Sequence, residues 1–320
     1  MNLTKNIQSK ATLTRLIEHA FPHRRLAGLN ELTEGYFNIA YEVSFEGGVE
    51  SILKIAPNPN VTVMTYEKNI MAAEVQSMQL VAEKTKVPLP QIEFYDSSCT
   101  ICNAPYFFMK KLLGKSLSSQ KSGLTAAQIS SVYASVGAMN KEINQITNPY
   151  FGYPEQQVLQ GENWFDTFYA MMKAVLQDAD KENIALTVSC GEVLKLLKKE
   201  IRIFSDVKIP RLVHWDIWDG NIFVQDGRLT GIIDWERCLW GDPLMEVGFR
   251  SYAQSSEFLK GYGITAFTEE ETRRILWYDL YLLITVAQEH VYRGYETTDL
   301  YDWATPLLRE QYAKLKERYS

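Results

Sequence analysis

Three polar side chains in one short stretch have the types and spacing that phosphoryl transfer requires. Asp216 is followed by Asn221 five residues later, and Asp234 lies further along the same stretch. A carboxylate can orient and deprotonate an attacking hydroxyl, and hard oxygen ligands hold the Mg²⁺ that accompanies nucleotide phosphates. The Asp-x-x-x-x-Asn spacing matches the catalytic loop of kinases. By itself this spacing would strongly favour an ordinary surface loop.

A predicted β-hairpin should bring these groups together. The apolar runs Ile222–Val224 and Thr230–Ile233 are typical of short strands, and Asp226-Gly227 between them indicates a tight turn. Because a hairpin joins its two ends, we expect Asp234 to lie beside Asn221 and Asp216. The whole pattern therefore favours a phosphoryl-transfer site over a surface loop.

The longer run resembles a known family signature. The residues that carry the resemblance are His214-x-Asp216-x-x-x-Gly220-Asn221, Ile233-Asp234-Trp235-Glu236 and Gly241-Asp242-Pro243. They resemble the aminoglycoside phosphotransferase/choline kinase family, small-molecule kinases with a protein-kinase-like fold. Weaker matches extend the resemblance over roughly residues 30–250. One departure is Trp215, where many members carry Gly.

The resemblance implies an α+β, protein-kinase-like two-lobe fold. Residues 1–112 would form a nucleotide-binding lobe with an antiparallel sheet and one key helix, and residues 113–320 a mostly helical catalytic and acceptor-binding lobe. ATP would be the phosphate donor, with GTP an alternative, and Mg²⁺ the metal. Asp216 would be the catalytic base, Asn221 and Asp234 the metal ligands, and Asp242 would brace the catalytic loop.

A lysine and a glutamate should complete the nucleotide site. Lys54 lies in a predicted strand between Leu53 and Ile55, where a kinase-like site needs a lysine for the α- and β-phosphates. A solvated strand lysine is the simpler alternative. Residues 66–85 predict one helix that contains two possible partners. We prefer Glu74 over Glu67, because its distance to Pro88 resembles the family spacing.

The loop before the strand Ile39–Phe45 is the candidate phosphate loop. Gly35 and Asn38 occupy it, and their backbone would lie over the phosphates in a kinase-like lobe. The glycine signal is poor, because no Gly-x-Gly-x-x-Gly is present. An ordinary hairpin loop is therefore the alternative.

A hinge between the lobes should follow two further strands, at residues 92–95 and 106–109. The candidates for backbone contact with the purine edge are Met109, Lys110, Lys111 and Leu112, on resemblance alone. The Ser- and Lys-rich stretch Lys115–Gly123 predicts a linker. Beyond it, apolar periodicity predicts helices at residues 126–143, 164–175, 193–204, 268–292 and 304–318.

Composition excludes several classes of protein. The chain has 320 residues, of which 46% are hydrophobic and 22% charged, as in globular proteins. A formal net charge of −6 argues against a nucleic-acid partner. No apolar run is long enough to predict a membrane span, and the first ten residues lack the apolar core of a signal peptide, so we expect a cytoplasmic protein. Cys99 and Cys102 are better explained as reduced thiols than as a zinc site. The oligomeric state is left open.

The acceptor should be a small molecule with a hydroxyl group. Five acids in the predicted helical lobe could meet ammonium groups and so favour an aminoglycoside or amino alcohol: Asp166, Asp219, Glu236, Asp279 and Glu289. Trp215 and Trp218 favour a macrolide or other partly apolar alcohol or sugar instead.

Two other functions fit the pattern less well. A protein kinase would need an activation segment, and the interval between Asp234 and Asp242 is too short for one. A non-catalytic nucleotide-binding regulatory protein would not need the complete set of residues named above.

Overall fold

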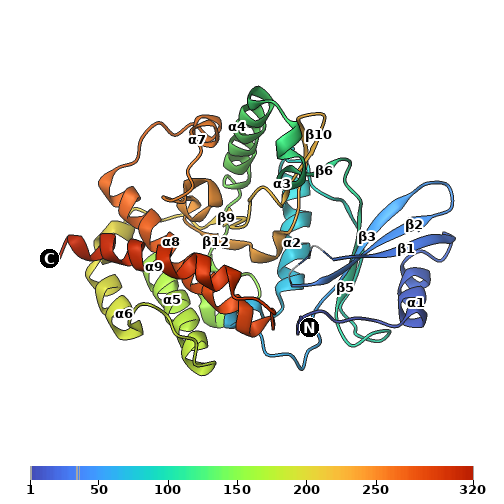
Figure 1. Ribbon diagram of the computed structural model, residues 1–320, viewed down its shortest axis with the longest axis horizontal. Coiled ribbons are helices and arrows are strands. Elements are labelled where there is room, and N and C mark those ends of the chain that lie inside the picture. Colours follow the sequence, from blue (N-terminus) through green and yellow to red (C-terminus); the bar gives the residue numbers. More distant parts are fainter. Residues whose placement is uncertain (1, 34, 36, 320) are drawn as a thin grey trace.

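A five-stranded antiparallel sheet occupies one end of the molecule and a group of helices the other (Figure 1). The computed structural model describes residues 2–33, 35 and 37–319. In spatial order the sheet contains β1 (Leu26–Leu32), β2 (Ile39–Phe45), β3 (Glu50–Ile55), β5 (Tyr106–Lys110) and β4 (Ile92–Asp96). The α+β prediction is confirmed. Every strand of this sheet lies before residue 112, but the division of the chain at that point remains a prediction.

The sheet is covered by α1 (Lys10–Ala20) and α2 (Ile70–Lys84). The single helix expected over residues 66–85 is instead a 3₁₀ turn, η1 (Thr65–Glu67), followed by α2. Asn69 between them adopts a left-handed conformation with φ of 56°. An isolated left-handed residue ends a helical path, and asparagine tolerates it better than most residues. Glu67 is thereby separated from the helix that carries Glu74.

Two other segments differ from expectation. Strand β1 was not predicted, because Gly28, Asn30 and Glu31 give it weak strand propensity, and pairing with β2 supplies its structure. The predicted linker at 115–123 is wrong. It contains β6 (Lys115–Ser116), α3 (Leu117–Gln120) and η2 (Lys121–Gly123), and Leu117 is fully buried. Pairing of β6 with β10 fixes a stretch whose composition looks flexible.

Two small sheets support the catalytic segment. One contains β10 (Ile222–Gln225) and β11 (Arg228–Ile232), which form the predicted hairpin across Asp226 and Gly227. The other has the order β8 (Gln160–Gly161), β7 (Phe151–Gly152), β12 (Leu239–Gly241) and β9 (Arg211–Val213). The segment between β9 and β10 is therefore held at both ends by sheet structure.

The helical end is built around α8 (Glu269–Tyr292), whose residues are buried along most of its length. The other helices are α4 (Ala126–Ile143), α5 (Trp164–Lys181), α6 (Cys190–Lys199), α7 (Ser256–Tyr262) and α9 (Asp299–Glu317). Figure 1 shows α9 and α5 beside α8. In the described part of the chain, no helix has the length and apolar character needed to cross a bilayer.

Candidate active site

The segment from His214 to Asn221, which we call the catalytic loop, is shaped by a buried carboxylate. Glu246 accepts hydrogen bonds from the backbone N–H groups of His214 (2.8 Å) and Trp215 (3.0 Å), one at each oxygen. It also accepts one from the Asn140 side chain at 2.7 Å. Burial raises the pKa of Glu246, but these donors oppose that effect. Glu246 therefore fixes the start of the loop.

This finding corrects the role expected of Asp242. The Asp242 carboxylate accepts hydrogen bonds from Arg274 and Tyr278, both at 2.8 Å, and caps the following turn through the N–H of Leu244. It anchors α8 rather than the catalytic loop. The sequence contains no spacing signal that would have distinguished Glu246 as the brace.

His214 fixes the loop further in its neutral form. Its Nδ1 accepts a hydrogen bond from the N–H of Asp216 (3.2 Å), and its Nε2 lies 3.1 Å from the carbonyl oxygen of Ile233. A ring that accepts at one nitrogen and donates at the other must be neutral. Burial agrees with this, since it lowers the pKa of His214 to about 4. The loop is thus tied to the end of the β10–β11 hairpin.

Trp215 lies in the core rather than beside an acceptor. It is fully buried and stacks on Tyr281, with ring centroids 5.2 Å apart. Its φ is 64°, a left-handed conformation that costs about 1–2 kcal/mol for a residue with a Cβ. That backbone conformation explains why glycine suits this position. Of the two tryptophans, Trp218 is the exposed one, at 43%, and it covers Gly220, where a Cβ would lie 2.3 Å from the Trp218 ring.

The structure brings Asp216, Asn221 and Asp234 together. The Asn221 side chain donates to the carbonyl oxygen of Asp216 (2.9 Å) and to its carboxylate (3.1 Å), and the N–H of Ile233 donates to the carbonyl oxygen of Asn221. Burial raises the pKa of Asp216 to about 6, although the guanidinium of Arg237, 3.8 Å away, opposes that shift. A carboxylate with such a pKa is suited to accept a proton near neutral pH.

Lys54, in β3, connects α2 to the segment that follows β11. Its ammonium group lies 2.6 Å from Glu74 and 2.8 Å from Asp234. Burial alone would lower the pKa of Lys54, but the two carboxylates raise it above its ordinary value. The rival Glu67 is paired instead with Arg293 at 3.0 Å. Of the two candidates, the structure therefore places Glu74 beside Lys54.

Glu236 is a possible metal ligand that was not predicted from the sequence. Oxygens of Glu74, Asp234 and Glu236 lie within 4.8 Å of one another in the described part of the chain. Burial and the nearby Asp234 raise the pKa of Glu236 well above its usual range. One oxygen of Glu74 has no hydrogen-bond partner among the described residues. Three carboxylates against one lysine leave an excess of negative charge and hard oxygen donors, which fit Mg²⁺.

The candidate phosphate loop is joined to the same cluster. The Asn38 side chain is buried and donates to Glu236 at 2.7 Å, a contact between the sheet end and the catalytic segment. Gly35 lies at the exposed side of the loop. The phosphate-binding role of both residues remains a prediction.

The four hinge candidates differ in the hydrogen bonds that their backbone N–H groups make. The N–H of Lys110 donates to the carbonyl oxygen of Gln91 (2.9 Å), and that of Lys111 to Glu50 (3.4 Å). Met109 lies inside β5 and is paired there with β3 on one side and β4 on the other. Contact of these four residues with a purine remains a prediction.

Four of the five acids expected to meet a cationic acceptor have other partners. Glu289 is paired with Arg237 and Arg293, Asp219 with Lys121, Asp279 with Ser251, and Glu236 with Asn38. Asp166 is exposed in the first turn of α5. Four of these five carboxylates thus already have a partner within the protein.

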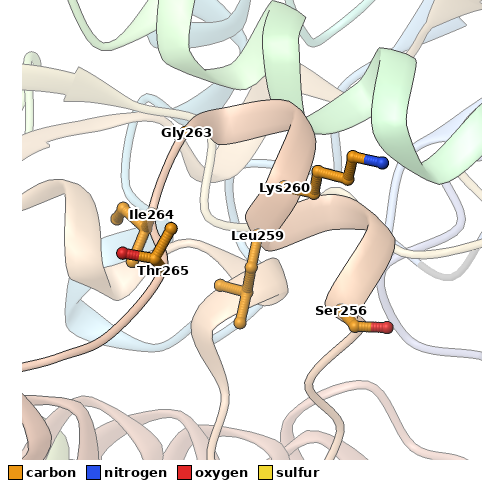
Figure 2. Close-up of a pocket in the computed structure, with 6 residues that line it drawn as sticks. All are labelled: Ser256, Leu259, Lys260, Gly263, Ile264 and Thr265. Atoms are coloured by element: carbon orange, nitrogen blue, oxygen red, sulfur yellow. The ribbon is translucent and has the colours of Figure 1, made fainter.

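Two features lie outside this site. A hollow of about 280 Å³ on α7 is lined by Ser256, Leu259, Lys260, Gly263, Ile264 and Thr265 (Figure 2). None of these residues belongs to the cluster described above, so we assign no chemistry to the hollow. Cys99 and Cys102 are free cysteines in the structure, the first exposed and the second buried.

Comparisons with known proteins agree with this geometry. A family model described as the phosphotransferase enzyme family matches residues 28–284. No curated protein sequence matches the chain significantly.

Three kinases are among the solved structures of similar fold. Because their sequence identity to this chain is low, these matches show the fold alone. Aminoglycoside phosphotransferase APH(4)-Ia, in complex with ADP and hygromycin B, is 17% identical, with a TM-score of 0.65 and coverage of 94% of this chain and 97% of that one. The GDP complex of aminoglycoside 2'-phosphotransferase-IIIa is 16% identical, with a TM-score of 0.66 and coverage of 98% and 100%. A proposed fructosamine-3-kinase from Thermobifida fusca is 15% identical, with a TM-score of 0.68 and coverage of 93% and 98%. The expected protein-kinase-like fold is confirmed.

Proposed function

Because this chain belongs to the phosphotransferase enzyme family, we propose that it transfers the γ-phosphoryl group of ATP to a hydroxyl group of a small molecule. The observation that carries the proposal is the meeting of two groups of residues. Asp216 and Asn221 come from the catalytic loop, and Asp234 connects them to the pair of Lys54 and Glu74. A site for phosphoryl transfer needs both groups within one cleft.

The proposed reaction uses each group for a separate task. The Asp216 carboxylate orients the acceptor hydroxyl and takes its proton as the new O–P bond forms. The bond between the γ-phosphorus and its bridging oxygen breaks, and ADP leaves with that oxygen and its electron pair. Lys54, held by Glu74, binds donor phosphates. Phosphoryl transfer is accelerated mainly by such positioning and by charge stabilisation.

Asp234, Asn221 and Glu236 would hold Mg²⁺ in this proposal. Bound there, the ion would neutralise phosphate charge and orient the γ-phosphoryl group. Asp234 has a left-handed backbone (φ 66°), which turns it out of the β11 direction toward Lys54. ATP is the proposed donor and GTP the alternative, with the purine edge recognised by the backbone within residues 109–112.

Two acceptor classes remain to be tested. Several relatives by fold were solved with aminoglycosides, which supports an aminoglycoside or amino alcohol. A partly apolar alcohol, such as a macrolide, is favoured by the exposed Trp218 two residues from Asp216 and by the internal pairing of Glu289 and Asp219. An aromatic face binds apolar or flat ligands, and paired carboxylates attract cations less strongly.

A coupled assay of ADP release tests the proposal. The full-length protein would be incubated with Mg·ATP and a panel of aminoglycosides, macrolides, amino alcohols and sugars, and phosphorylated products identified by mass spectrometry. We expect acceptor-dependent ADP release that disappears without Mg²⁺. Binding of Mg·ATP without turnover on any acceptor would support a regulatory nucleotide-binding protein instead.

A further inference from the structure

The N-terminal segment, residues 2–8, contacts both the helical end and the sheet end of the molecule. The N–H of Leu3 donates to the carbonyl oxygen of Arg293 at the end of α8 (2.8 Å). Asn6 donates to the carbonyl oxygen of Ala56, just after β3, and to the side chain of Asn103, both at 3.1 Å. Thr4, between them, is buried. Figure 1 places the N-terminus between the sheet and the helices. The position of the intervening Lys5 is therefore fixed from both sides.

The ammonium group of Lys5 lies against the candidate phosphate loop. It donates to the carbonyl oxygen of Asn38 at 2.8 Å, and a Cβ built on Gly35 would lie 3.4 Å from it. The charges that act on it most strongly are those of Glu31, Glu236, Lys54 and Asp234, and burial lowers its pKa. Lys5 therefore lies close to the same charged cluster as Lys54.

Among the described residues, the Lys5 ammonium group has few partners. An ammonium group has three hydrogens to donate, and one of them is used on Asn38. No ion pair joins Lys5 to a carboxylate within residues 2–33, 35 and 37–319. A half-buried cation without a paired anion carries a desolvation cost, which an anionic ligand would offset.

We propose that Lys5 is a phosphate-binding residue, contributed by the N-terminal segment, that contacts the terminal phosphates of the donor nucleotide at the edge of the phosphate loop. This inference rests on the proposed function, because it requires a nucleotide in the cleft. Lys54 approaches that nucleotide from the sheet, and Lys5 approaches it from the loop. The two lysines together supply positive charge opposite the carboxylate cluster.

The alternative is that Lys5 only holds the loop in place through Asn38. The two roles differ in how they depend on the ligand. Loss of a direct phosphate contact weakens ATP more than adenosine, because adenosine has no phosphate. A restraint on the loop needs only a hydrogen-bond donor at residue 5, so Lys5→Gln, which keeps a donor for Asn38 but carries no charge, would then bind Mg·ATP as the parent protein does.

Isothermal titration calorimetry on the full chain distinguishes these roles. The variants are Lys5→Met, Lys5→Gln and Lys5→Arg, with Lys10→Met as a matched control, because Lys10 is an exposed lysine at the start of α1. The ligands are Mg·ATP, Mg·ADP and adenosine. A charged hydrogen bond typically contributes enough to change affinity about tenfold or more. We therefore expect Lys5→Met to weaken Mg·ATP about tenfold, adenosine less than twofold, and Lys5→Arg to recover part of the loss.

Two outcomes would overturn the inference. One is Mg·ATP affinity within twofold of the parent in Lys5→Met or in Lys5→Gln. The other is an equal loss for Mg·ATP, Mg·ADP and adenosine. If the parent protein itself failed to bind Mg·ATP, the proposed function would fail instead, so the two failures are separate. Should Lys5→Met unfold, as judged by its thermal transition, Lys5→Gln provides the same comparison with a polar side chain.

Discussion

Two buried ionic networks connect the sheet end of this molecule to its helical end, and they differ in charge balance. In the first, which we call the balanced network, Arg237 and Arg293 face Glu67 and Glu289. In the second, which we call the acidic cluster, Lys54 and the nearby Lys5 face the three carboxylates of Glu74, Asp234 and Glu236. Both are largely withdrawn from water.

The difference indicates which network is structural and which awaits a ligand. Removing charges from water is costly, and mutual pairing offsets that cost when opposite charges are equal in number. The balanced network meets this condition by itself. The acidic cluster does not. Burial is the main cause of the raised pKa values of Glu74 and Glu236, and the negative charge of Asp234 raises both further. A divalent cation with its nucleotide would complete the second network.

Substitution of Asp216 should have the largest effect on turnover. This residue lies between the two networks: it is near Arg237 of the balanced network, and it accepts a hydrogen bond from Asn221, which lies beside the acidic cluster. We expect Asp216→Asn to lower kcat by about 10²–10⁴-fold, because a positioned base contributes an effect of that size. Affinity for Mg·ATP should change little, since this carboxylate meets the acceptor. Steady-state kinetics and calorimetry measure the two effects.

Asp226→Asn is the matched control for that substitution, because Asp226 lies exposed in the hairpin turn and asparagine tolerates its positive φ. It should keep parental turnover. Parental turnover in Asp216→Asn as well would remove Asp216 from the proposed mechanism.

Removing one charge from the balanced network should lower the free energy of unfolding. Arg293→Met leaves Glu67 buried without its ion-pair partner and Glu289 with Arg237 alone, and breaking a buried pair in this way costs about 3–5 kcal/mol. Denaturant unfolding measures the loss. As a control, Lys314→Met breaks an exposed pair with Glu310 and should cost less than about 1 kcal/mol. Equal stabilities of the two variants would refute the structural assignment of the balanced network.

Removing one charge from the acidic cluster should not lower the free energy of unfolding, but it should weaken ligand binding. Glu236→Gln removes one of its negative charges but keeps an oxygen that can accept the Asn38 hydrogen bond. We expect the free energy of unfolding without ligands to stay unchanged or rise, while Mg·ATP binds about tenfold more weakly. Calorimetry and denaturant unfolding on one preparation test both expectations. A clear loss of stability without ligand would show that the cluster is already balanced.

The smallest expected effect is on the pH dependence of turnover. Burial raises the pKa of Asp216 to about 6, so its basic form is present above that pH and is lost as the pH falls. At the pKa kcat should be half its plateau, and one pH unit lower it should be about tenfold below the plateau. A pH–rate profile with saturating substrates measures this. The range from about pH 5 to pH 7 spans this pKa by about one unit on each side. A flat profile over that range would contradict the role of Asp216 as the base.

Local sequence patterns determined several parts of the molecule. The apolar runs on either side of Asp226 and Gly227 were sufficient to predict the β10–β11 hairpin, and with it the approach of Asp234 to Asn221. The residues of α8 likewise followed helical periodicity along the sequence. In both cases the deciding interactions lie within the segment or between its two arms, so the spacing of residue types contains the information.

Other features were decided only by tertiary structure. The spacing of residues allowed either Glu67 or Glu74 beside Lys54, and Arg293, more than two hundred residues away, takes Glu67. Glu246 rather than Asp242 braces the catalytic loop, and Trp215 packs in the core instead of facing an acceptor. The partner of a buried charge is set by distances between elements remote in sequence, and these distances exist only once the sheet and the helices have packed together.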